Sequence, residues 1–370
     1  MESSSVKWVR LGDYIEQCDK RNTDLRYDIS DVMGMTITKE IISTKANLEG
    51  NDLSKFKIVD PGEFVFNPRT HGKRIGLGLN NTNKAFLISW NNIAFRIAYK
   101  DKLLPNYLYL YFNRDEWDRY ACFNSWGSST EVFTWNELCR MEIPLPSVAE
   151  QQKVVNVWRA FREIKEQNEA KAAPLMQLCQ SYIQELKHKY PMQEIGPYLQ
   201  FFKEKNKDNE IKLEQGINIA KEFITPQRSN SDLSSRIKVR TGQFAYCTQL
   251  NNENVAISLR VGPDCVVSPV YEVFEIKKEY KHILNSEYLL LWLIRKEFGR
   301  YVYWSSVGSA YEFLRYDNLY SYKIPLPPIE VQQAIVNIYK CANEAKRIAE
   351  EADRLSREVC PALLQHVIHS

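Results

Sequence analysis

The hydrophobic and polar positions of the chain follow a β-type pattern first and a helical pattern afterwards. Short apolar runs separated by Gly, Pro and Asn, such as EFVFN (63–67), AFLISW (85–90) and IAFRIAY (93–99), are typical of strands joined by turns. LPNYLYLYFNRDEWDRY (104–120) then has helical spacing, and residues 149–186 have the pattern of one long amphipathic helix. We therefore expect a compact globule of the α/β (or α+β) class followed by a long helix.

A second long amphipathic segment, 331–368, closes the chain. At 1.5 Å per residue, each segment of about 38 residues makes a helix of roughly 55 Å. The expected apolar face of the first helix comprises Val154, Val157, Phe161, Ile164, Leu175, Leu178, Tyr182 and Leu186. That of the second comprises Ile335, Ile338, Ala342, Ala345, Ala349, Ala352, Leu355, Val359 and Leu363.

Helices of this length need a partner, because one globule cannot cover the whole apolar face. We expect the two helices to pair antiparallel as a coiled coil with a globule at each end. The alternative is that each helix packs on its own globule. Pro174 and Pro361 are expected to bend or interrupt the helices locally.

The chain is a tandem repeat of one unit. Tyr107–Gln184 aligns without a gap with Tyr288–Gln365, at a constant offset of 181 residues. This predicts two halves, near 1–190 and 191–370, in a pseudo-two-fold arrangement. Earlier matches are GMTITKEII (34–42) with GINIAKEFI (216–224) and FKIVDPGEFVFN (56–67) with RIKVRTGQFAYC (236–247).

The decapeptides IPLPSVAEQQ (143–152) and IPLPPIEVQQ (324–333) stand between globule and helix in the two halves. Because Pro fixes its own φ and disfavours helix at the preceding residue, I-P-L-P is predicted to be extended. Ser147 and Pro328 are then expected to start the helices, with an acidic residue near each positive N-terminal end. The motif therefore sets the angle at which each globule meets its helix.

Composition indicates a folded, soluble, cytoplasmic protein of about two domains. The 370 residues are 44 % hydrophobic, 26 % charged and 12 % aromatic, and no run of 18 apolar residues or signal sequence is present. The eight cysteines lack the spacing of a zinc site or a disulfide framework, so we expect reduced thiols. A net charge of +3 is small for a protein that holds a nucleic-acid backbone unaided, so such binding would need partners.

The repeated I-P-L-P segment, preceded by G-S-[SA]-x-E-[VF] and followed by a long amphipathic helix, resembles the specificity subunit of type I restriction-modification systems. The resemblance covers nearly the whole chain, although the usual Glu-Gln pair (Glu150-Gln151) is interrupted in the second copy by Val331. It implies two target recognition domains, 1–146 and 191–327, and two spacer helices, 147–190 and 328–370. In that family each domain reads half of a split DNA site.

The resemblance also implies that this chain binds double-stranded DNA, two methyltransferase subunits and motor-nuclease subunits. The partners would use S-adenosylmethionine, ATP and Mg²⁺ to methylate adenine and cleave unmodified DNA, and this chain would bind no cofactor. The exposed outer faces of the long helices are the expected methyltransferase contact.

Motifs for catalysis are missing, which agrees with a non-catalytic subunit. NPRT (67–70) falls short of the N-P-P-[YF] of an adenine methyltransferase, and no G-x-x-x-x-G-K-[ST] loop or H-E-x-x-H pair is present. The five histidines are too dispersed to indicate a metal site.

Three kinds of segment are candidates for DNA contact. They are the basic loop NPRTHGKRIG (67–76), whose arginines suit phosphate or guanine; the polar loops NSWGSSTE (124–131) and SSVGSAYE (305–312); and the Lys-Asn segments after the first expected helix of each half. The alternative for the basic loop is a solvated surface loop. The alternative for the polar loops is that Ser128 and Ser309 cap helices that begin near residues 131 and 312. The candidate residues are Lys20, Arg21, Arg69, His71, Lys73, Arg74, Asn124, Ser125, Ser129, Lys205, Arg228, Arg260, Ser305 and Ser306.

The central loops of the halves differ in charge and length, so the two globules should read different half-sites, with centres about 34–36 Å apart. Two other functions are compatible with the sequence. One is a specificity subunit of a type IIB-like system, and the other is a coiled-coil adaptor without a DNA role. A stand-alone enzyme is not expected.

Overall fold

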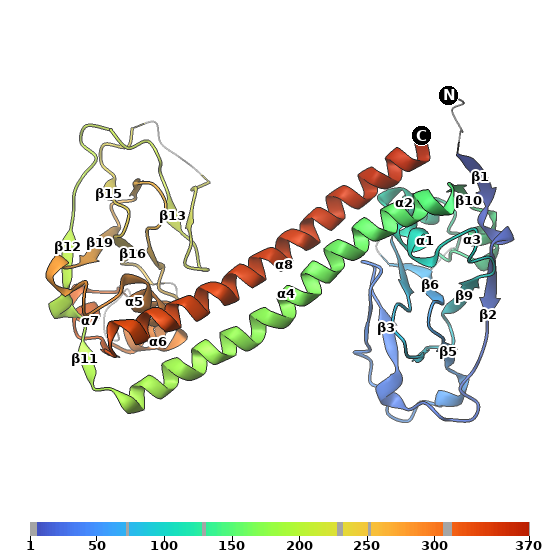
Figure 1. Ribbon diagram of the computed structural model, residues 1–370, viewed down its shortest axis with the longest axis horizontal. Helices are drawn as coiled ribbons and strands as arrows, with labels where there is room; N and C mark the ends of the chain where they lie inside the picture. Colours follow the sequence, from blue (N-terminus) through green and yellow to red (C-terminus); the bar gives the residue numbers. More distant parts are fainter. Residues whose placement is uncertain are drawn as a thin grey trace. The chain divides into compact units, whose positions relative to one another are not determined.

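The computed structural model describes residues 6–71, 74–127, 131–227, 232–250, 253–305 and 313–369. The chain divides into two compact units. The first contains Met1–Gln167 and Ile348–Ser370, and the second contains Asn168–Arg347. Each unit therefore holds one globule together with part of both long helices (Figure 1).

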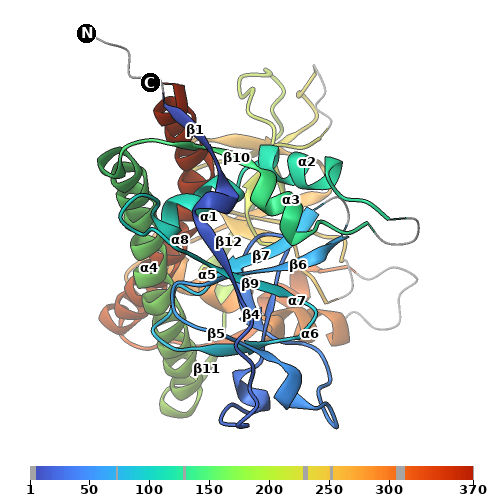
Figure 2. The same cartoon turned by 90° about the vertical axis from the view of Figure 1, so that its right-hand side faces the viewer.

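The first unit is built on a four-stranded antiparallel sheet in the order β2-β9-β6-β7, which faces the viewer in Figure 2. Three further strand pairs, β1–β10, β3–β4 and β5–β8, surround it. The strands are β1 (Lys7–Arg10), β2 (Ile15–Cys18), β3 (Met33–Met35), β4 (Ile41–Ser43), β5 (Lys57–Val59), β6 (Phe64–His71), β7 (Arg74–Leu79), β8 (Phe86–Ile88), β9 (Ile93–Ile97) and β10 (Glu142–Leu145). The short helices are α1 (Pro105–Phe112), α2 (Asp115–Phe123) and α3 (Trp135–Arg140).

The second unit repeats this arrangement strand for strand. Its four-stranded sheet has the order β12-β19-β16-β17, and its strand pairs are β11–β20, β13–β14 and β15–β18. The strands are β11 (Met192–Glu194), β12 (Leu199–Phe202), β13 (Gly216–Ile217), β14 (Phe223–Ile224), β15 (Ile237–Val239), β16 (Phe244–Cys247), β17 (Ile257–Leu259), β18 (Cys265–Val267), β19 (Tyr271–Ile276) and β20 (Lys323–Pro325). The short helices are α5 (Ser286–Leu293), α6 (Lys296–Ser305) and α7 (Tyr316–Tyr320).

The internal repeat predicted from the sequence is thus confirmed, and so is the mixed helix and strand fold. All the named strand pairs are antiparallel, which places the globules in the α+β rather than the doubly wound class. The predicted helix over 104–120 is two helices, because Arg114 is extended between α1 and α2.

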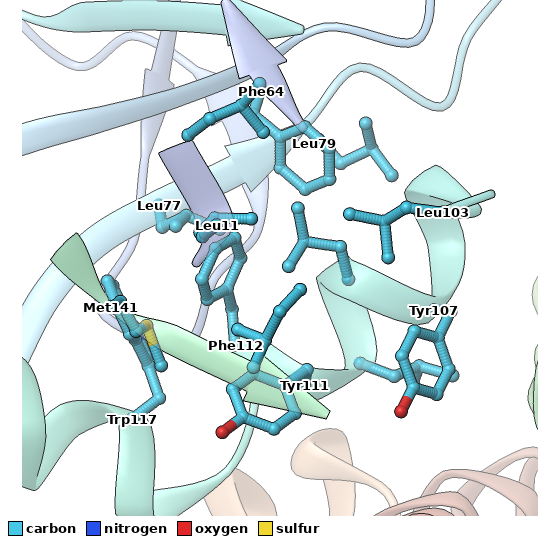
Figure 3. Packing of buried hydrophobic residues seen from close by; sticks show 14 of the residues in the cluster. Leu11, Phe64, Leu77, Leu79, Leu103, Tyr107, Tyr111, Phe112, Trp117 and Met141 are labelled. Atoms are coloured by element: carbon cyan, nitrogen blue, oxygen red, sulfur yellow. The ribbon is translucent and has the colours of Figure 1, made fainter. Parts of the chain in front are cut away.

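The core of the first unit lies where α1 and α2 cover the four-stranded sheet, and Figure 3 shows part of it. Phe64 and Phe95, from neighbouring strands, stack with ring centroids 4.9 Å apart. Phe244 and Phe274 stack at the same place in the second unit, 4.7 Å apart. Aromatic pairs on adjacent strands fix the sheet register, so both sheets present their loops from equivalent positions.

The long helices are α4 (Val148–Lys189) and α8 (Ile329–His369). Pro174 and Pro361 lie inside them, so the expected alternative that a proline interrupts its helix is wrong. A proline leaves the carbonyl four residues earlier without its helical donor, and these carbonyls belong to Ala170 and Arg357, which are both exposed. Water can therefore satisfy them. Neither these helices nor any other in the described part of the chain is long and apolar enough to span a membrane.

The two helices pair antiparallel. In the first unit, Lys165 of α4 forms an ion pair of 2.8 Å with Asp353 late in α8. In the second unit, the Cys179 thiol of α4 donates to the carbonyl of Ile335 early in α8. The coiled coil predicted from the sequence is therefore present.

The helix seam is continuous with the core of each globule. Val154 and Val155 of α4 and Leu364 and Val367 of α8 belong to the same buried cluster as the sheet of the first unit. The helices thus pack both on one another and on a globule, so the two packing alternatives are combined. Part of the predicted α4 face is wrong, since Ile164, Leu178 and Tyr182 are exposed and Cys179 and Ile183 are buried instead.

The I-P-L-P segments are extended, as expected, and each forms a strand. Ile143, Pro144 and Leu145 pair in β10 with β1, and Ile324 and Pro325 pair in β20 with β11. The helices begin at the predicted positions. The Ser147 hydroxyl accepts a hydrogen bond from the Glu150 amide (3.3 Å) and so caps α4.

One glutamine of each decapeptide is completely buried and ties the helix to the globule. The Gln151 side chain accepts from the Leu104 amide (2.9 Å) and donates to the carbonyls of Lys102 (2.8 Å) and Pro146 (3.0 Å). These carbonyls and this amide belong to the segment before α1 and to the decapeptide itself. We call this arrangement the glutamine clasp.

The second unit has the same clasp at Gln332. Its side chain accepts from the Asn285 amide (2.9 Å) and donates to the carbonyls of Ile283 (2.7 Å) and Pro327 (2.8 Å). The three bonds correspond one to one with those of Gln151. This explains why the glutamine is part of both decapeptides.

Replacing Gln151 by Ala is expected to lower the free energy of unfolding of the first unit by about 3 kcal/mol, because three buried backbone groups lose their partner. Chemical denaturation measures this loss. Hydrogen exchange should locate it at the Leu104 amide, which loses its acceptor.

Gln152→Ala is the matched control, since the Gln152 side chain donates to Asn156 on the exposed side of the same helix turn. It should change stability by less than about 0.5 kcal/mol. Equal destabilisation by the two substitutions would contradict the role assigned to the clasp.

Candidate nucleic-acid interface

The structure brings together two of the segments singled out in the sequence. The tip of the β6–β7 hairpin, within 67–74, lies against the segment that joins α2 to α3. The Thr70 amide donates to the Glu131 carbonyl (3.1 Å), and the Phe133 amide donates to the Pro68 carbonyl (2.7 Å). Arg69 and Val132 face each other between these bonds. The two loop regions therefore lie side by side at their described residues, 68–70 and 131–133.

The second unit joins the equivalent segments in the same way. Gln249, just after β16, faces Phe313, and the Leu314 amide donates to the Thr248 carbonyl (2.8 Å). Arg69 and Gln249 therefore occupy equivalent positions in the two units. We call these two places the hairpin tips.

Arg69 and Gln249 are both exposed. Within the described residues, neither side chain has a hydrogen-bonding or ionic partner in the protein. Arginine matches the two acceptors of guanine, whereas glutamine matches the donor and acceptor of adenine. The hairpin tips thus share their geometry and differ in the base that their side chains would read.

The other candidates in the basic loop divide into two groups. His71 ends β6 and Lys73 follows it, but the His71 side chain and all of Lys73 lie outside the described residues. Arg74 begins β7 and lies near two carboxylates, 3.6 Å from Asp115 and 3.8 Å from Asp118. Half its side chain remains exposed, so Arg74 combines a weak ion pair with access to solvent.

Asp118 makes its shorter contact with a buried lysine. The Lys39 ammonium lies 2.7 Å from it, and burial lowers the pKa of this lysine while Asp118 opposes the shift. In the second unit the equivalent Lys221 donates to the Val255 carbonyl, and burial again lowers the pKa. Both lysines have φ near +66° and hold the turn between β3 and β4 or between β13 and β14. Their role is structural.

The candidates near β2 and β12 are mostly bound within the protein. Lys20 forms an ion pair with Asp60 (2.8 Å), and a hydrogen bond with Asp60 raises the pKa of Lys20. The equivalent pair in the second unit has reversed charges, with Glu204 3.0 Å from Arg240. This ion pair therefore does not by itself indicate a phosphate contact. The expected helix before Lys20 is also wrong, because a 3-10 turn and β2 stand there.

The neighbours of these ion pairs have distinct roles. Arg21 pairs with Asp19 (3.1 Å) on the surface, whereas Lys205 is exposed and has no side-chain partner within the described residues. Asn22 and Asn206 are completely buried and hydrogen-bond to backbone groups of the following loops. The two asparagines therefore organise the fold.

Arg260 is a correction, since it is buried with only 6 % of its surface exposed. Its guanidinium donates to the Gln215 side chain (2.5 Å) and the Pro263 carbonyl (2.6 Å) and lies over the Phe223 ring. A guanidinium satisfied in this way holds loops of the second unit together and is not positioned to contact DNA. The sequence pattern did not reveal this, because two of the partners, Gln215 and Phe223, are distant along the chain.

The polar candidates at the ends of α2 and α6 mainly complete those helices. Asn124 donates to the Tyr120 carbonyl (2.9 Å), and the buried Ser125 donates to the Ala121 carbonyl (2.6 Å). The Ser305 hydroxyl donates to the Val302 carbonyl (3.0 Å). Ser125 is therefore a second correction, because it is not accessible to DNA.

Three further candidates, Ser129, Arg228 and Ser306, fall outside the described residues, and so does the suggested cap Ser128. Ser309, the other suggested cap, also lies there. The α3 helix begins at Trp135 rather than near residue 131, and its cap is the Thr134 hydroxyl, which accepts from the Glu137 amide (3.3 Å).

Some residues on this surface were missed in the sequence. They are Gln249 and the strongly exposed aromatics Phe123 (80 %), Trp126 (71 %) and Trp304 (76 %). A search for positive charge did not find Gln249, because glutamine is neutral. Its alignment with Arg69 in the internal repeat would have identified it as a candidate. The recurrence of an aromatic residue directly before both polar loops was the available signal for Phe123 and Trp304.

Comparison with known proteins supports this description. Residues 185–341 match the family described as "Type I restriction modification DNA specificity domain". No curated protein matches the chain. The structure of a type I restriction-modification S subunit from M. genitalium has a TM-score of 0.62 at 12 % identity, covering 99 % of this chain and 97 % of that one.

Two further structures match over nearly their full length. The HsdS subunit from Thermoanaerobacter tengcongensis has 18 % identity and a TM-score of 0.42, covering 100 % of this chain and 97 % of that one. A chain from a structure of type I R-M complex assembly and conformational transition has 15 % identity and a TM-score of 0.38, covering 99 % and 98 %.

The resemblance found in the sequence is therefore confirmed: the chain has the fold of the type I restriction-modification S subunit from M. genitalium, and residues 185–341 match the family model of the type I DNA specificity domain.

Proposed function

We propose that this chain recognises a bipartite, asymmetric DNA site, reading one half-site with each globule, and positions methyltransferase and restriction subunits on it. The observation that carries the proposal is the pair of equivalent hairpin tips. Arg69 and Gln249 are exposed and held by matching backbone contacts, yet they differ in the base that they suit. Identical tips would favour a palindrome, whereas these favour two different half-sites.

The catalytic activities belong to the partners in this proposal. Two methyltransferase subunits, using S-adenosylmethionine, modify adenine, and motor-nuclease subunits, using ATP and Mg²⁺, cleave unmodified DNA. The chain itself holds no cofactor and acts in the cytoplasm. Its hairpin tips supply recognition, and its long helices supply the surface on which the methyltransferases assemble.

Mapping N6-methyladenine in DNA from cells that express this chain with its methyltransferase tests the proposal. The expected result is a split motif with two different halves separated by unread base pairs. An unbroken palindrome, or no sequence preference, would contradict it. If the purified partner subunit carries both the methyltransferase and the nuclease, the system is of the type IIB-like kind.

Arg69→Ala and Gln249→Ala should each relax a different half of the motif. Removing a bidentate base contact costs about 1–3 kcal/mol of discrimination at one base pair, so other bases should become tolerated at one position in each case. Sequencing the methylated sites of each variant measures this, and the untouched half-site serves as the internal control. If both substitutions relaxed the same half, the assignment of one globule to one half-site would fail.

A methyltransferase contact is proposed on α4. Leu178 and Tyr182 are about 43–44 % exposed and lie four residues apart, so they form an apolar strip on the helix surface. Exposed apolar and aromatic side chains of this kind form the centres of protein interfaces.

Leu178→Glu together with Tyr182→Glu should weaken assembly with the methyltransferase about tenfold or more, because two charges would enter the interface. Co-purification of tagged subunits measures the effect. Gln180→Glu, which adds a charge at an exposed position of the same helix, should leave assembly unchanged. Equal loss in both variants would indicate a general effect of charge and would remove this strip from the interface.

A further inference from the structure

An arginine and an aromatic residue recur together in the two short helices next to the hairpin tips. Helix α2 ends in Arg119-Tyr120-Ala121-Cys122-Phe123, and α6 contains Arg300-Tyr301-Val302-Tyr303-Trp304 at the same aligned positions. The shared pattern is Arg-Tyr followed, after two intervening residues, by an aromatic residue. Both helices are labelled in Figure 1.

The tyrosine of each pattern is explained by packing. The Tyr120 ring contacts Phe133, with centroids 6.4 Å apart. The Tyr301 ring contacts Tyr322 at 5.1 Å, and its hydroxyl donates to the Asn318 carbonyl (3.2 Å). These contacts account for the recurrence of the tyrosine.

The arginine and the last aromatic residue have no such explanation in the fold. Phe123 is 80 % exposed and Trp304 is 76 % exposed, so neither contributes a buried apolar surface to its globule. Arg119 makes one surface ion pair with Glu116 (3.3 Å), which contributes little to stability. Arg300 is exposed and has no side-chain partner within the described residues.

The two unexplained side chains lie on the same face of their helix. Positions i and i+4 are neighbours on a helix surface, which places Arg119 beside Phe123 and Arg300 beside Trp304. We call these two couples the Arg–aromatic pairs. Each pair combines a cation with an apolar ring, the combination that suits a phosphate next to a sugar or base.

The pairs are continuous with the hairpin tips. In the first unit, Phe123 is followed by Trp126, whose amide and carbonyl both bond to Val132 (3.2 and 3.1 Å), the residue that faces Arg69. In the second unit, Ser305, the neighbour of Trp304, accepts a hydrogen bond from the Asn318 side chain (2.9 Å). Asn318 lies four residues after Leu314, whose amide donates to the Thr248 carbonyl beside Gln249. A duplex read by a hairpin tip would therefore lie within reach of the neighbouring pair.

We propose that the Arg–aromatic pairs hold the DNA backbone and do not read its sequence. This inference rests on the proposed function. The hairpin tips differ between the two units, whereas the Arg–aromatic pairs are shared. If the two globules read different half-sites, a shared feature contacts what both half-sites contain, which is the sugar-phosphate backbone. The arginine contacts a phosphate oxygen, and the aromatic ring packs against the adjacent deoxyribose.

Affinity measurements on the complex of this chain with its methyltransferase test the proposal. The probes are a duplex with the mapped target and a scrambled duplex of the same composition, each over a range of salt concentrations. Arg119→Gln and Arg300→Gln should weaken binding to both duplexes about equally and reduce the salt dependence by about one phosphate each. Phe123→Ala and Trp304→Ala should weaken binding to both duplexes about fivefold or more without changing the salt dependence, because each removes an apolar contact with the sugar.

Two matched variants serve as controls. Arg140 is about as exposed as Arg119 and pairs with an acid in the same way, and Trp90 is an exposed aromatic (60 %) in the turn between β8 and β9. Arg140→Gln and Trp90→Ala should leave both affinities unchanged. Phe123→Trp should keep most of the affinity, which separates the ring from any effect on folding.

Three results would overturn the proposal. The first is unchanged affinity in all four variants. The second is a loss confined to the target duplex with an altered methylated motif, since the pairs would then read bases. The third is that the variants assemble poorly with the methyltransferase, although the fraction that does assemble binds DNA normally. The pairs would then be a contact with the methyltransferase and not with DNA. If the wild-type complex bound the two duplexes equally well, the proposed function would be refuted instead. In that case, weaker binding of the variants to the scrambled duplex would still support a contact between the Arg–aromatic pairs and the DNA backbone.

Discussion

The glutamine clasp is the contact on which the arrangement of each unit depends. A long helix can support a globule only if its first turn is fixed in rotation as well as position. Gln151 and Gln332 achieve this because a carboxamide satisfies three backbone groups at once, two carbonyls and one amide, inside a buried site. A smaller or apolar side chain would leave those groups without partners, at a cost of about 1–3 kcal/mol each.

With this junction fixed, the globules can differ elsewhere without losing their common geometry. The stacked phenylalanines, the buried asparagines and the backbone contacts at the hairpin tips recur in both units. Even the ion pair between Lys20 and Asp60 recurs with its charges exchanged, as Glu204 and Arg240. In the proposed function, the shared positions hold the fold or the DNA backbone, whereas the divergent positions select a sequence.

The sequence predicted the repeat, the extended I-P-L-P segments and the long helices because these depend on local pattern and on alignment within the chain. It failed where a residue's environment is set by distant segments. Arg260 read as a surface cation, yet Gln215 and Phe223 enclose it. Leu178 and Tyr182 were assigned to the buried face of α4 but are exposed, and Cys179 and Ile183 are buried instead. Because α4 has apolar residues on both sides of the seam, its own sequence does not show which of them the partner helix buries.

The distribution of charge also bears on how such a chain would hold DNA. Several exposed cations, including Lys20, Arg21 and Arg240, already pair with carboxylates, and the net charge is only +3. Each of these ion pairs must break before its cation can neutralise a phosphate. Breaking the pair costs free energy, and this reduces the net binding free energy gained from counterion release. Arg119, with one weak surface ion pair, and Arg300, each beside an exposed ring, would then give positioning more than affinity. Tight binding would depend on the additional DNA contacts of the methyltransferases, so free specificity chains would not occupy sites without the subunits that act there.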